Sequence, residues 1–334
     1  MRGTGTGSAP LVYSGDGDMS DAMTRPPAAR AAVVGAGLIG AGWSALFLAH
    51  GIDVKAWDPD PGARPALEEL VASALEDLRE LGLEGSGQLD FAATLEEALE
   101  GAEFVQENAP EREELKTALL AEIDALAPTG AIIASSTSSL LRSHITRACG
   151  DPERVVIGHP FNPPHLIPLV EIVGPAPDAA STRRAVAFYE ALGKETVVLK
   201  KEARGHLINR INSALWREAV SLYQQGLADP ADIDRAIKAG PALRWPFLGP
   251  YETYHLGGGE GGIRHYFEHL QPIQEERWKE MPTPELDDAF RARIIESVEK
   301  AMADRSVAQR ARERDRRLLA MLKLRAKLTQ QEPD

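Results

Sequence analysis

The sequence predicts an α/β protein in which a doubly wound parallel sheet of the Rossmann type precedes an all-helical domain. Three observations support this prediction. Between residues 29 and 200, short apolar runs alternate with segments of helical periodicity, as strands and helices do in a parallel sheet. A Gly-x-Gly-x-x-Gly motif at residues 35–40 follows the first apolar run. Beyond residue 200 the strand-like runs stop, and only helical patterns continue to residue 334.

The expected strands are short apolar runs, which suit strands covered on both faces. They lie at residues 31–37, 53–58, 103–110, 131–136, 154–159, 168–174 and 196–200. Helices are expected between them at residues 38–51, 63–82 and 112–128. Gly51 can close the first of these helices, because glycine readily adopts the left-handed conformation found at helix ends. In the third helix an apolar stripe at helical spacing runs through Leu115, Leu119, Ile123 and Leu126.

Residues 201–334 are expected to form a helical domain for substrate binding and dimerisation. The stripe of its first helix ends at Gly226 and consists of Leu207, Ile208, Ile211, Leu215, Ala219 and Leu222. Further helices are expected at residues 231–239, 260–278, 284–303 and 306–328. The last of these is rich in Arg and Leu, so it either presents a solvated charged face or uses its leucines in a dimer contact. A homodimer through this domain is the expected assembly.

The composition argues against two classes of partner. The chain holds 37 Lys and Arg against 50 Asp and Glu, a net charge of −13, which disfavours binding to the phosphates of nucleic acid. No apolar run approaches the ~20 residues needed to cross a bilayer. With 334 residues and a hydrophobic fraction of 43%, the chain can bury the cores of two domains. We therefore expect a small-molecule substrate, and neither a nucleic acid nor a membrane as partner.

The cysteine content and the first residues bear on location. Cys149 is the single cysteine, which suits a small buried residue in a reducing cytoplasm. Residues 1–28 are rich in Gly, Ser, Asp and Pro, and they lack the basic start and continuous apolar core of a secretory signal. We expect a disordered extension there, within which Met19 and Met23 are alternative starts.

The glycine motif has the context of a dinucleotide-binding fingerprint. Gly35 permits a tight turn, Gly37 lets the backbone approach a pyrophosphate at the helix N-terminus, and Gly40 allows close packing of helix on strand. Asp58 ends the next expected strand, about 20 residues further on, where it can bind the ribose hydroxyls and repel a 2′-phosphate. NAD is therefore the expected cofactor, although an ordinary strand–helix turn would also use these glycines. The expected contacts are Gly35, Gly37, Leu38, Ile39, Gly40 and Asp58.

Several further stretches resemble the 3-hydroxyacyl-CoA dehydrogenase family. They are residues 136–140 (Ser-Thr-Ser-Ser-Leu), 158–163 (Gly-His-Pro-Phe-Asn-Pro) running on to 169–171, 205–210 (Gly-His-Leu-Ile-Asn-Arg), and 105–107 with Glu111 and Lys116. The resemblance covers roughly residues 30–330. It implies an NAD-dependent dehydrogenase that oxidises a 3-hydroxyl group. The chain departs from the usual family pattern at Ser136, where an Asn normally precedes Thr-Ser-Ser.

The resemblance also implies roles for individual residues. His159 would be the general base, and Glu171, twelve positions later, would orient it. Ser138 and Asn209 would bind the reacting oxygen. Glu111 and Lys116 would line the cleft for cofactor and substrate. This set suits the chemistry, because loss of hydride from a secondary alcohol also requires a base for the hydroxyl proton and donors for the developing alkoxide.

Residues 240–265 resemble a branch of that family, which the resemblance implies acts on free acids such as carnitine and L-gulonate and which includes lambda-crystallin. Where enzymes for CoA thioesters have an apolar stretch, this chain has Arg244-Trp245, followed by Gly-Gly-Glu-Gly-Gly-Ile-Arg-His at 258–265. Arg244 could bind a carboxylate with its planar fork, and aromatic faces could bind a trimethylammonium group. The candidates for the aromatic contact are Trp245, Phe247, Tyr251, Tyr254 and Tyr266. The structural alternatives are a surface ion pair for Arg244 and packing in a helix core for the aromatic residues.

Carnitine is thus the expected substrate, and a 3-hydroxyacyl-CoA or L-gulonate is the alternative within the enzyme class. Two other classes stay open. A dehydrogenase fold can be recruited as a structural protein, although an intact His159–Glu171 pair argues against this. His265-Tyr-Phe-Glu-His269 matches an inverted zinc-protease motif, which would place two histidines on one helix face without an evident third ligand. A solvated helix face is the simpler interpretation of that motif.

Overall fold

The computed structural model describes residues 28–329, so the extension expected at the N-terminus lies outside the described residues except for Ala28. The described chain forms two compact units. Of the described residues, 28–209 and 312–329 make the first unit, and 210–311 make the second. The chain therefore leaves the first unit within one long helix and returns to it within another.

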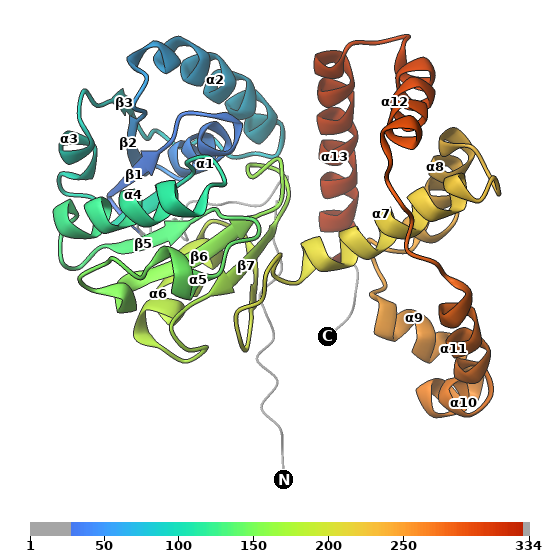
Figure 1. Ribbon diagram of the computed structural model, residues 1–334. Helices are drawn as coiled ribbons and strands as arrows, with labels where there is room; N and C mark the ends of the chain where they lie inside the picture. The colour runs from blue at the N-terminus through green and yellow to red at the C-terminus, as the bar shows by residue number, and fades with distance from the viewer. Residues whose placement is uncertain (1–27, 330–334) are drawn as a thin grey trace. The chain divides into compact units, whose positions relative to one another are not determined.

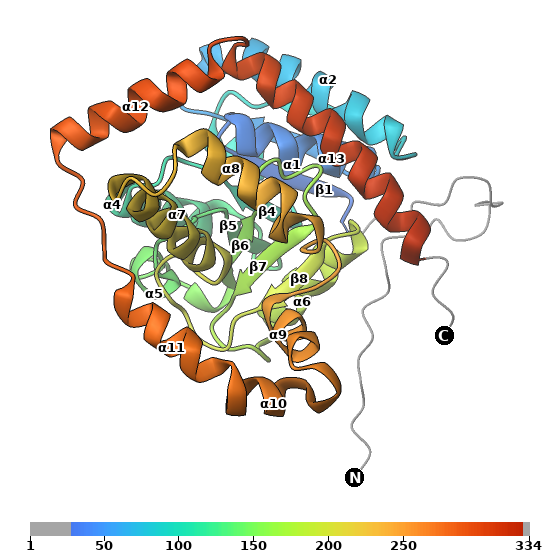
Figure 2. The same ribbon diagram turned by 90° about the vertical axis from the view of Figure 1, so that its right-hand side faces the viewer.

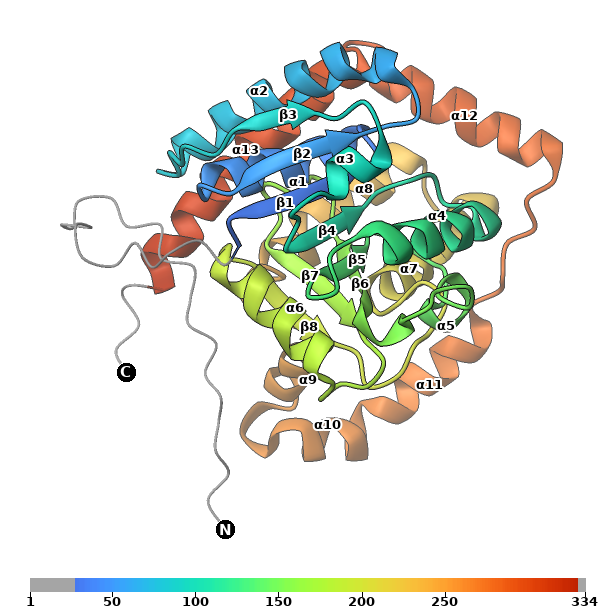
Figure 3. The same cartoon turned by 90° about the vertical axis from the view of Figure 1, so that its left-hand side faces the viewer.

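The first unit is built on an eight-stranded sheet with the strand order β3-β2-β1-β4-β5-β6-β7-β8 (Figures 1 and 3). The strands are β1 (Arg30–Val34), β2 (Asp53–Trp57), β3 (Leu89–Phe91), β4 (Phe104–Glu107), β5 (Ile132–Ser135), β6 (Val155–Pro160), β7 (Leu169–Val173) and β8 (Glu195–Val198). All neighbours are parallel except β6 and β7, which confirms the doubly wound α/β prediction. The antiparallel pair follows from the short link at 161–168, because a parallel return needs a crossover of a dozen or more residues.

Helices cover both faces of this sheet. They are α1 (Leu38–Ala49), α2 (Arg64–Glu80), α3 (Leu95–Leu99), α4 (Glu113–Leu126), α5 (Arg142–Ile145) and α6 (Ala180–Ala191). Alternate residues of β1 point to opposite faces, so Val33 joins a core with α1, α2 and α6, whereas Val34 joins a core with α3, α4 and α5. Phe104 and Phe188 stack in the first core with ring centroids 3.7 Å apart. The expected helices at 38–51, 63–82 and 112–128 are confirmed to within two residues at each end.

The remaining helices lie wholly or partly in the second unit. They are α7 (Ile208–Gln224), α8 (Pro230–Ala239), α9 (Pro250–Gly257), α10 (Gly262–His269), α11 (Gln271–Glu280), α12 (Asp288–Met302) and α13 (Val307–Thr329). The single helix expected at 260–278 is two helices, because Pro272 stands in the first turn of α11 and cannot continue the hydrogen bonding of α10. None of the described helices is long and apolar enough to span a membrane.

The C-terminal part of α13 packs on the first unit, alongside α2 (Figure 2). Leu319 is 2% exposed and lies in a small core with Leu81 and Leu166. Lys323 adds an ion pair to Glu80, 3.1 Å from Nζ to Oε2. Leucines of α13 that the sequence offered for a dimer contact, such as Leu319, therefore pack against residues of the same chain. Leu324 and Leu328 stay exposed.

We predict that Leu319→Ala lowers the free energy of unfolding by about 2–5 kcal/mol, because the truncation leaves a cavity beside Leu81 and Leu166. Urea denaturation of purified protein measures this effect. Leu324→Ala is the matched control on the same helix, and since Leu324 is 47% exposed, it should change the free energy by about 0.5 kcal/mol or less. Equal effects of the two substitutions would contradict the packing of α13 on the first unit.

Candidate active site

The glycine motif forms the turn between β1 and α1. Gly35 has a φ of +99°, and a Cβ there would lie 2.9 Å from the backbone of Asn108. A Cβ on Gly40 would come within 2.0 Å of the carbonyl oxygen of Gly35, so only glycine fits at either position. Gly37, directly before the start of α1, has open space where a Cβ would be. An open helix N-terminus of this kind suits the pyrophosphate of a dinucleotide.

Asp58 lies beside this turn, directly after β2. Its Oδ2 accepts a hydrogen bond from the N–H of Ala36 at 2.9 Å, and its Oδ1 accepts one from the N–H of Asp60 at 3.0 Å. The carboxylate is thereby held next to the glycine turn. A carboxylate in this place can accept hydrogen bonds from ribose hydroxyls, and it disfavours a phosphate at the same position.

His159 and Glu171 face each other across the antiparallel pair β6–β7. The strand register pairs the two residues, and Nδ1 of His159 lies 2.8 Å from Oε2 of Glu171. Both side chains are buried. Since a carboxylate only accepts hydrogen bonds, Nδ1 carries the proton, and Nε2 is left with a free lone pair. The imidazole is thus held in the tautomer that can accept a proton at Nε2.

Glu171 is also bound by the start of α7. Its Oε1 accepts hydrogen bonds from the N–H groups of Leu207 at 2.8 Å and Ile208 at 3.0 Å. Burial by itself would raise the pKa of Glu171. The hydrogen bonds from His159 and from the two backbone N–H groups outweigh burial and hold the pKa below its ordinary value. The residue is therefore a carboxylate at neutral pH.

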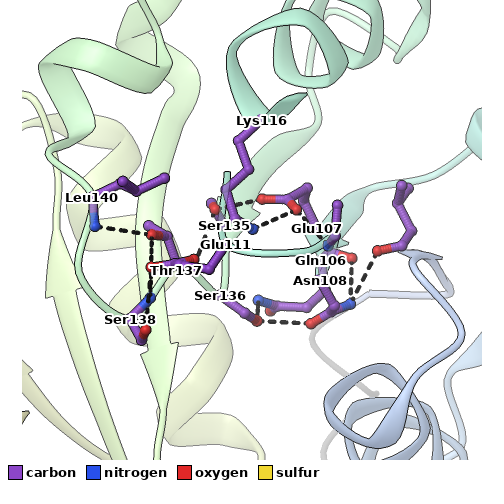
Figure 4. Close-up of polar contacts among 12 residues, drawn as sticks. Gln106, Glu107, Asn108, Glu111, Lys116, Ser135, Ser136, Thr137, Ser138 and Leu140 are labelled. Atoms are coloured by element: carbon purple, nitrogen blue, oxygen red, sulfur yellow. Dashed lines mark hydrogen bonds and ion pairs between the residues drawn. The ribbon is translucent and has the colours of Figure 1, made fainter. Parts of the chain in front are cut away.

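The turn at residues 137–139 is organised around Glu111 (Figure 4). Oε1 of Glu111 lies within hydrogen-bonding distance of five donors. The N–H of Ser139 and the hydroxyl of Thr137 are at 2.8 Å, the N–H of Ser138 is at 2.9 Å, and the hydroxyls of Ser138 and Ser139 are at 3.1 Å. Burial raises the pKa of Glu111, but these donors and the charge of Lys116 bring its net pKa below the ordinary value. An ionised Glu111 thus accepts hydrogen bonds from the N–H groups of Ser138 and Ser139, the last two residues of the turn.

The carbonyl oxygens of the same turn accept hydrogen bonds from residues 205–209. The N–H of Gly205 binds the oxygen of Ser139 at 3.2 Å, and Nδ2 of Asn209 binds the oxygen of Ser138 at 3.0 Å. The oxygen of Thr137 lies 2.9 Å from Nε2 of His206. The turn that carries Ser138 is therefore held on its N–H side by Glu111 and on its carbonyl side by the start of α7.

A cavity of about 410 Å³ opens over these groups. Its lining consists of Ile39, Asn108, Ala109, Glu111, Ser136, Ser138, His159, Pro160, Phe161, Asn162 and Asn209. It brings together all the predicted catalytic residues except Glu171, which lies behind His159. Of the predicted cofactor contacts, Ile39 and Glu111 line it. Lys116 does not, because it is 1% exposed and its Nζ forms an ion pair with Glu107 at 2.7 Å.

Glu107 is a buried charge that was not among the predicted site residues. Besides Lys116, its carboxylate accepts hydrogen bonds from the N–H of Ala109 at 2.6 Å and from the hydroxyl of Ser135 at 2.5 Å. A buried ion pair is tolerated only when its remaining valences are satisfied in this way. The signal in the sequence was an acidic residue at the end of an apolar strand with a lysine on the following helix.

Ser136 stands at the position where the chain departs from the usual family pattern. Its hydroxyl donates to Oδ1 of Asn108 at 2.7 Å and accepts from Nε2 of Gln106 at 2.9 Å (Figure 4). Nε1 of Trp43 also points to it at 3.3 Å. The amide of Asn108 consequently lines the cavity in a fixed orientation, and Asn108 was not among the predicted site residues.

The predicted substrate contacts all lie in the second unit. Arg244 is exposed, as are Trp245, Phe247 and Tyr251, with Tyr251 87% exposed. Tyr254 and Tyr266 face each other with ring centroids 4.8 Å apart.

His265 and His269 lie together on α10, with ring centroids 4.3 Å apart. Within residues 28–329, however, no three His, Cys, Asp or Glu residues are grouped so that they could hold a metal ion. The zinc alternative therefore lacks a third ligand in the described chain.

Comparisons with known proteins show the family of this chain. The family described as 3-hydroxyacyl-CoA dehydrogenase matches the chain with its NAD binding domain at residues 30–203 and its C-terminal domain at residues 205–293. The chain therefore belongs to the 3-hydroxyacyl-CoA dehydrogenase family, as the resemblance predicted, and it is an NAD-dependent oxidoreductase that acts on a CH–OH group.

Similar proteins cover nearly the whole chain. The L-carnitine dehydrogenase of Streptomyces griseus is 46% identical over 90% of this chain and 90% of its own length. The L-carnitine dehydrogenase of Streptomyces coelicolor is 45% identical over 93% and 99%. Among solved structures, 5-formyl-3-hydroxy-2-methylpyridine 4-carboxylic acid 5-dehydrogenase is similar with a TM-score of 0.76 and 26% identity, over 89% of this chain and 98% of its own. A 3-hydroxyacyl-CoA dehydrogenase of Archaeoglobus fulgidus has a TM-score of 0.62 and 26% identity, over 88% and 99%.

We predict that Asp58→Ala weakens the preference for NAD over NADP. Loss of hydrogen bonds to a charged group is worth about 1.5–3 kcal/mol, so kcat/KM for NAD should fall roughly tenfold or more. Steady-state rates with both cofactors measure the ratio. Asp60→Ala, two residues further on, is the control and should keep the preference of the wild type. A wild type that uses NADP as efficiently as NAD would contradict this role of Asp58.

Proposed function

We propose that the enzyme oxidises the 3-hydroxyl group of a short free 3-hydroxy acid to the 3-keto acid, with carnitine and 3-dehydrocarnitine as substrate and product. The observation that carries the proposal is the His159–Glu171 pair beside Ser138 and Asn209 in one cavity. The relatives named L-carnitine dehydrogenase, 41–46% identical to this chain, support the choice of substrate.

In this proposal His159 is the general base. Bound NAD would accept the hydride that leaves carbon 3 of the substrate. Nε2 of His159 takes the hydroxyl proton, and the electrons of the O–H bond become the second bond of the new carbonyl group. Glu171, ionised and hydrogen-bonded to Nδ1, stabilises the imidazolium that results.

Ser138 and Asn209 would bind the reacting oxygen. A carboxylate oxygen has about two lone-pair directions, so the five donors around Oε1 of Glu111 exceed its capacity. The hydroxyl of Ser138, one of the two most distant at 3.1 Å, can therefore turn towards the substrate at little cost. Asn209 uses one N–H on Ser138 and keeps a second for the substrate. Both donors are strengthened as negative charge develops on the oxygen.

For substrate binding we assign the carboxylate to Arg244 and the trimethylammonium group to aromatic faces of the second unit. An arginine fork binds a carboxylate with two parallel hydrogen bonds. Trp245, Phe247 and Tyr251 are exposed and so are free to contact a ligand. A quaternary ammonium is attracted to aromatic faces by about 2 kcal/mol when the contact is desolvated.

We further propose a homodimer and a cytoplasmic location. Within the described chain α7 buries only Val220 and Ser221, while Ile211, Leu215 and Trp216 remain exposed on it. A second copy could cover these side chains, since apolar patches of this kind mark interfaces. The single thiol, Cys149, is unpaired, and burial raises its pKa to about 11, as suits an unreactive thiol in a reducing compartment.

We predict that His159→Gln lowers kcat by about 10²–10⁴, because glutamine can hydrogen-bond but cannot take up a proton. NAD binding should be unchanged, since the glycine turn and Asp58 are intact. Any pH dependence of the oxidation rate that comes from this proton transfer should be absent in the variant. Formation of NADH followed by absorbance measures the rate. Turnover near the wild-type value would rule out His159 as the base.

We predict that Arg244→Lys raises KM for carnitine and that Arg244→Ala raises it further, since lysine keeps the charge but loses the planar fork. Affinity for NAD should not change. Replacing the quaternary ammonium of carnitine by a neutral tert-butyl group should lower kcat/KM about tenfold or more. Arg235→Ala, on an exposed arginine of α8, is the matched control.

Carnitine, its tert-butyl analogue, L-gulonate and 3-hydroxybutyryl-CoA should be compared on the wild type and these variants. A higher kcat/KM for the thioester, or unaltered carnitine oxidation in Arg244→Ala, would contradict the proposed substrate.

A further inference from the structure

His206 is a buried imidazole to which the proposed reaction gives no role. It is 1% exposed, and its backbone adopts a φ of +49°, a conformation uncommon outside glycine. Nε2 lies 2.9 Å from the carbonyl oxygen of Thr137. Nδ1 is buried and has no hydrogen-bond partner. The ring centroid lies 5.1 Å from that of His159.

The contacts of His206 determine its protonation state. A carbonyl oxygen only accepts, so Nε2 carries a proton and the unpartnered Nδ1 is the lone pair of a neutral ring. Burial lowers the pKa of His206 and outweighs the carbonyl of Thr137, which raises it, and the nearby His159 lowers it further. Two carboxylates, Glu171 and Glu111, act in the raising direction, but the net pKa remains below the ordinary value. The ring stays neutral while His159 takes up a proton.

His206 also joins two parts of the site. Its ring holds the carbonyl directly before Ser138, the residue proposed to bind the reacting oxygen. Its left-handed backbone turns the chain so that the next two N–H groups, those of Leu207 and Ile208, reach Glu171. The same residue thus connects the turn that carries Ser138 to the carboxylate behind the base.

We propose that His206 is a positioning residue whose Nε2–H holds the Ser138 turn against the start of α7, so that Ser138, Asn209 and the His159–Glu171 pair keep one geometry. This inference rests on the proposed function of those four residues. A misplacement of about 1 Å in a catalytic arrangement can cost about 10²-fold in rate, which makes such a link consequential.

The test compares His206→Gln with His206→Met. Both side chains are unbranched and of similar length, and both meet the same backbone strain, but only glutamine offers a donor near the place of Nε2. His206→Met should lower kcat about tenfold to a hundredfold with the dissociation constant of NAD unchanged. His206→Gln should recover most of the loss. Both variants should keep the pH profile of the wild type, because His159 rather than His206 takes up the proton. His50→Gln, which removes a histidine at the end of α1, is the control and should leave kcat unchanged.

Three results would overturn the inference: wild-type kcat in His206→Met, equal losses in both variants, or an altered pH profile in His206→Gln. The first two would show that the donor is not needed, and the third that His206 titrates. His159→Gln, assayed in parallel, keeps the outcomes apart, since an active His159→Gln would refute the proposed function itself. Should His206→Met fail to fold, the ¹⁵N spectrum of histidine-labelled wild type decides. A neutral ring protonated at Nε2 between pH 6 and 9 supports the inference, and a ring that titrates in that range overturns it.

Discussion

The site depends on one carboxylate, that of Glu171, which accepts hydrogen bonds from two sides. One oxygen binds the imidazole of His159 on the neighbouring strand, and the other binds two backbone N–H groups at the start of α7. The antiparallel pairing of β6 and β7 places Glu171 opposite His159, and the short link between these strands forces that pairing. The reversal of strand direction between β6 and β7, which β8 shares, is therefore what brings His159 and Glu171 together.

Two other acidic side chains, one fully buried and one partly exposed, likewise accept hydrogen bonds from several donors. Glu107, fully buried, is balanced by Lys116 and by donors from the ends of β4 and β5. Glu111, with an exposed side, gathers the donors of the turn at residues 137–139. Each carboxylate takes up N–H groups that lie at strand ends and would otherwise lack partners, and this stabilises irregular backbone close to the cavity. The acidic residues thus hold the loops on which the polar lining of the cavity depends.

The sequence predicted the sheet well because its parallel strands are buried on both faces and read as continuous apolar runs. It missed β3, which has three residues including Asp90, and it named no helix at α3, α5 or α6. It also missed α9, whose aromatic side chains are exposed and show no buried stripe. The break between α10 and α11 could have been predicted from Pro272, but the helical periodicity on both sides of it favoured a single helix. The reversal of β7 was open to prediction from the length of the link at 161–168, but the alternation of strands and helices favoured a parallel interpretation.

The site was predictable where residue types carried chemistry and a known motif set their spacing, as for His159 and Glu171. It was not predictable where the geometry of the site depends on hydrogen bonds between distant segments. The contacts of His206 with Thr137 and of Ser136 with Asn108 join residues far apart in the chain, and no local pattern encodes them. The buried position of Lys116 likewise follows from Glu107, which looked in the sequence like part of an ordinary strand.

The hydrogen bonds behind the cavity form a chain with a single direction. The phenol of Tyr189 donates to Oε1 of Gln106 at 2.6 Å, which leaves Nε2 of Gln106 to donate to Ser136. Ser136 in turn donates to Oδ1 of Asn108, because an amide oxygen can only accept. Burial raises the pKa of Tyr189, so the phenol keeps the proton that it donates to Gln106. The amide that the cavity presents to a ligand is consequently oriented through contacts that begin at Tyr189 of α6, a helix that contributes no residue to the lining of the cavity.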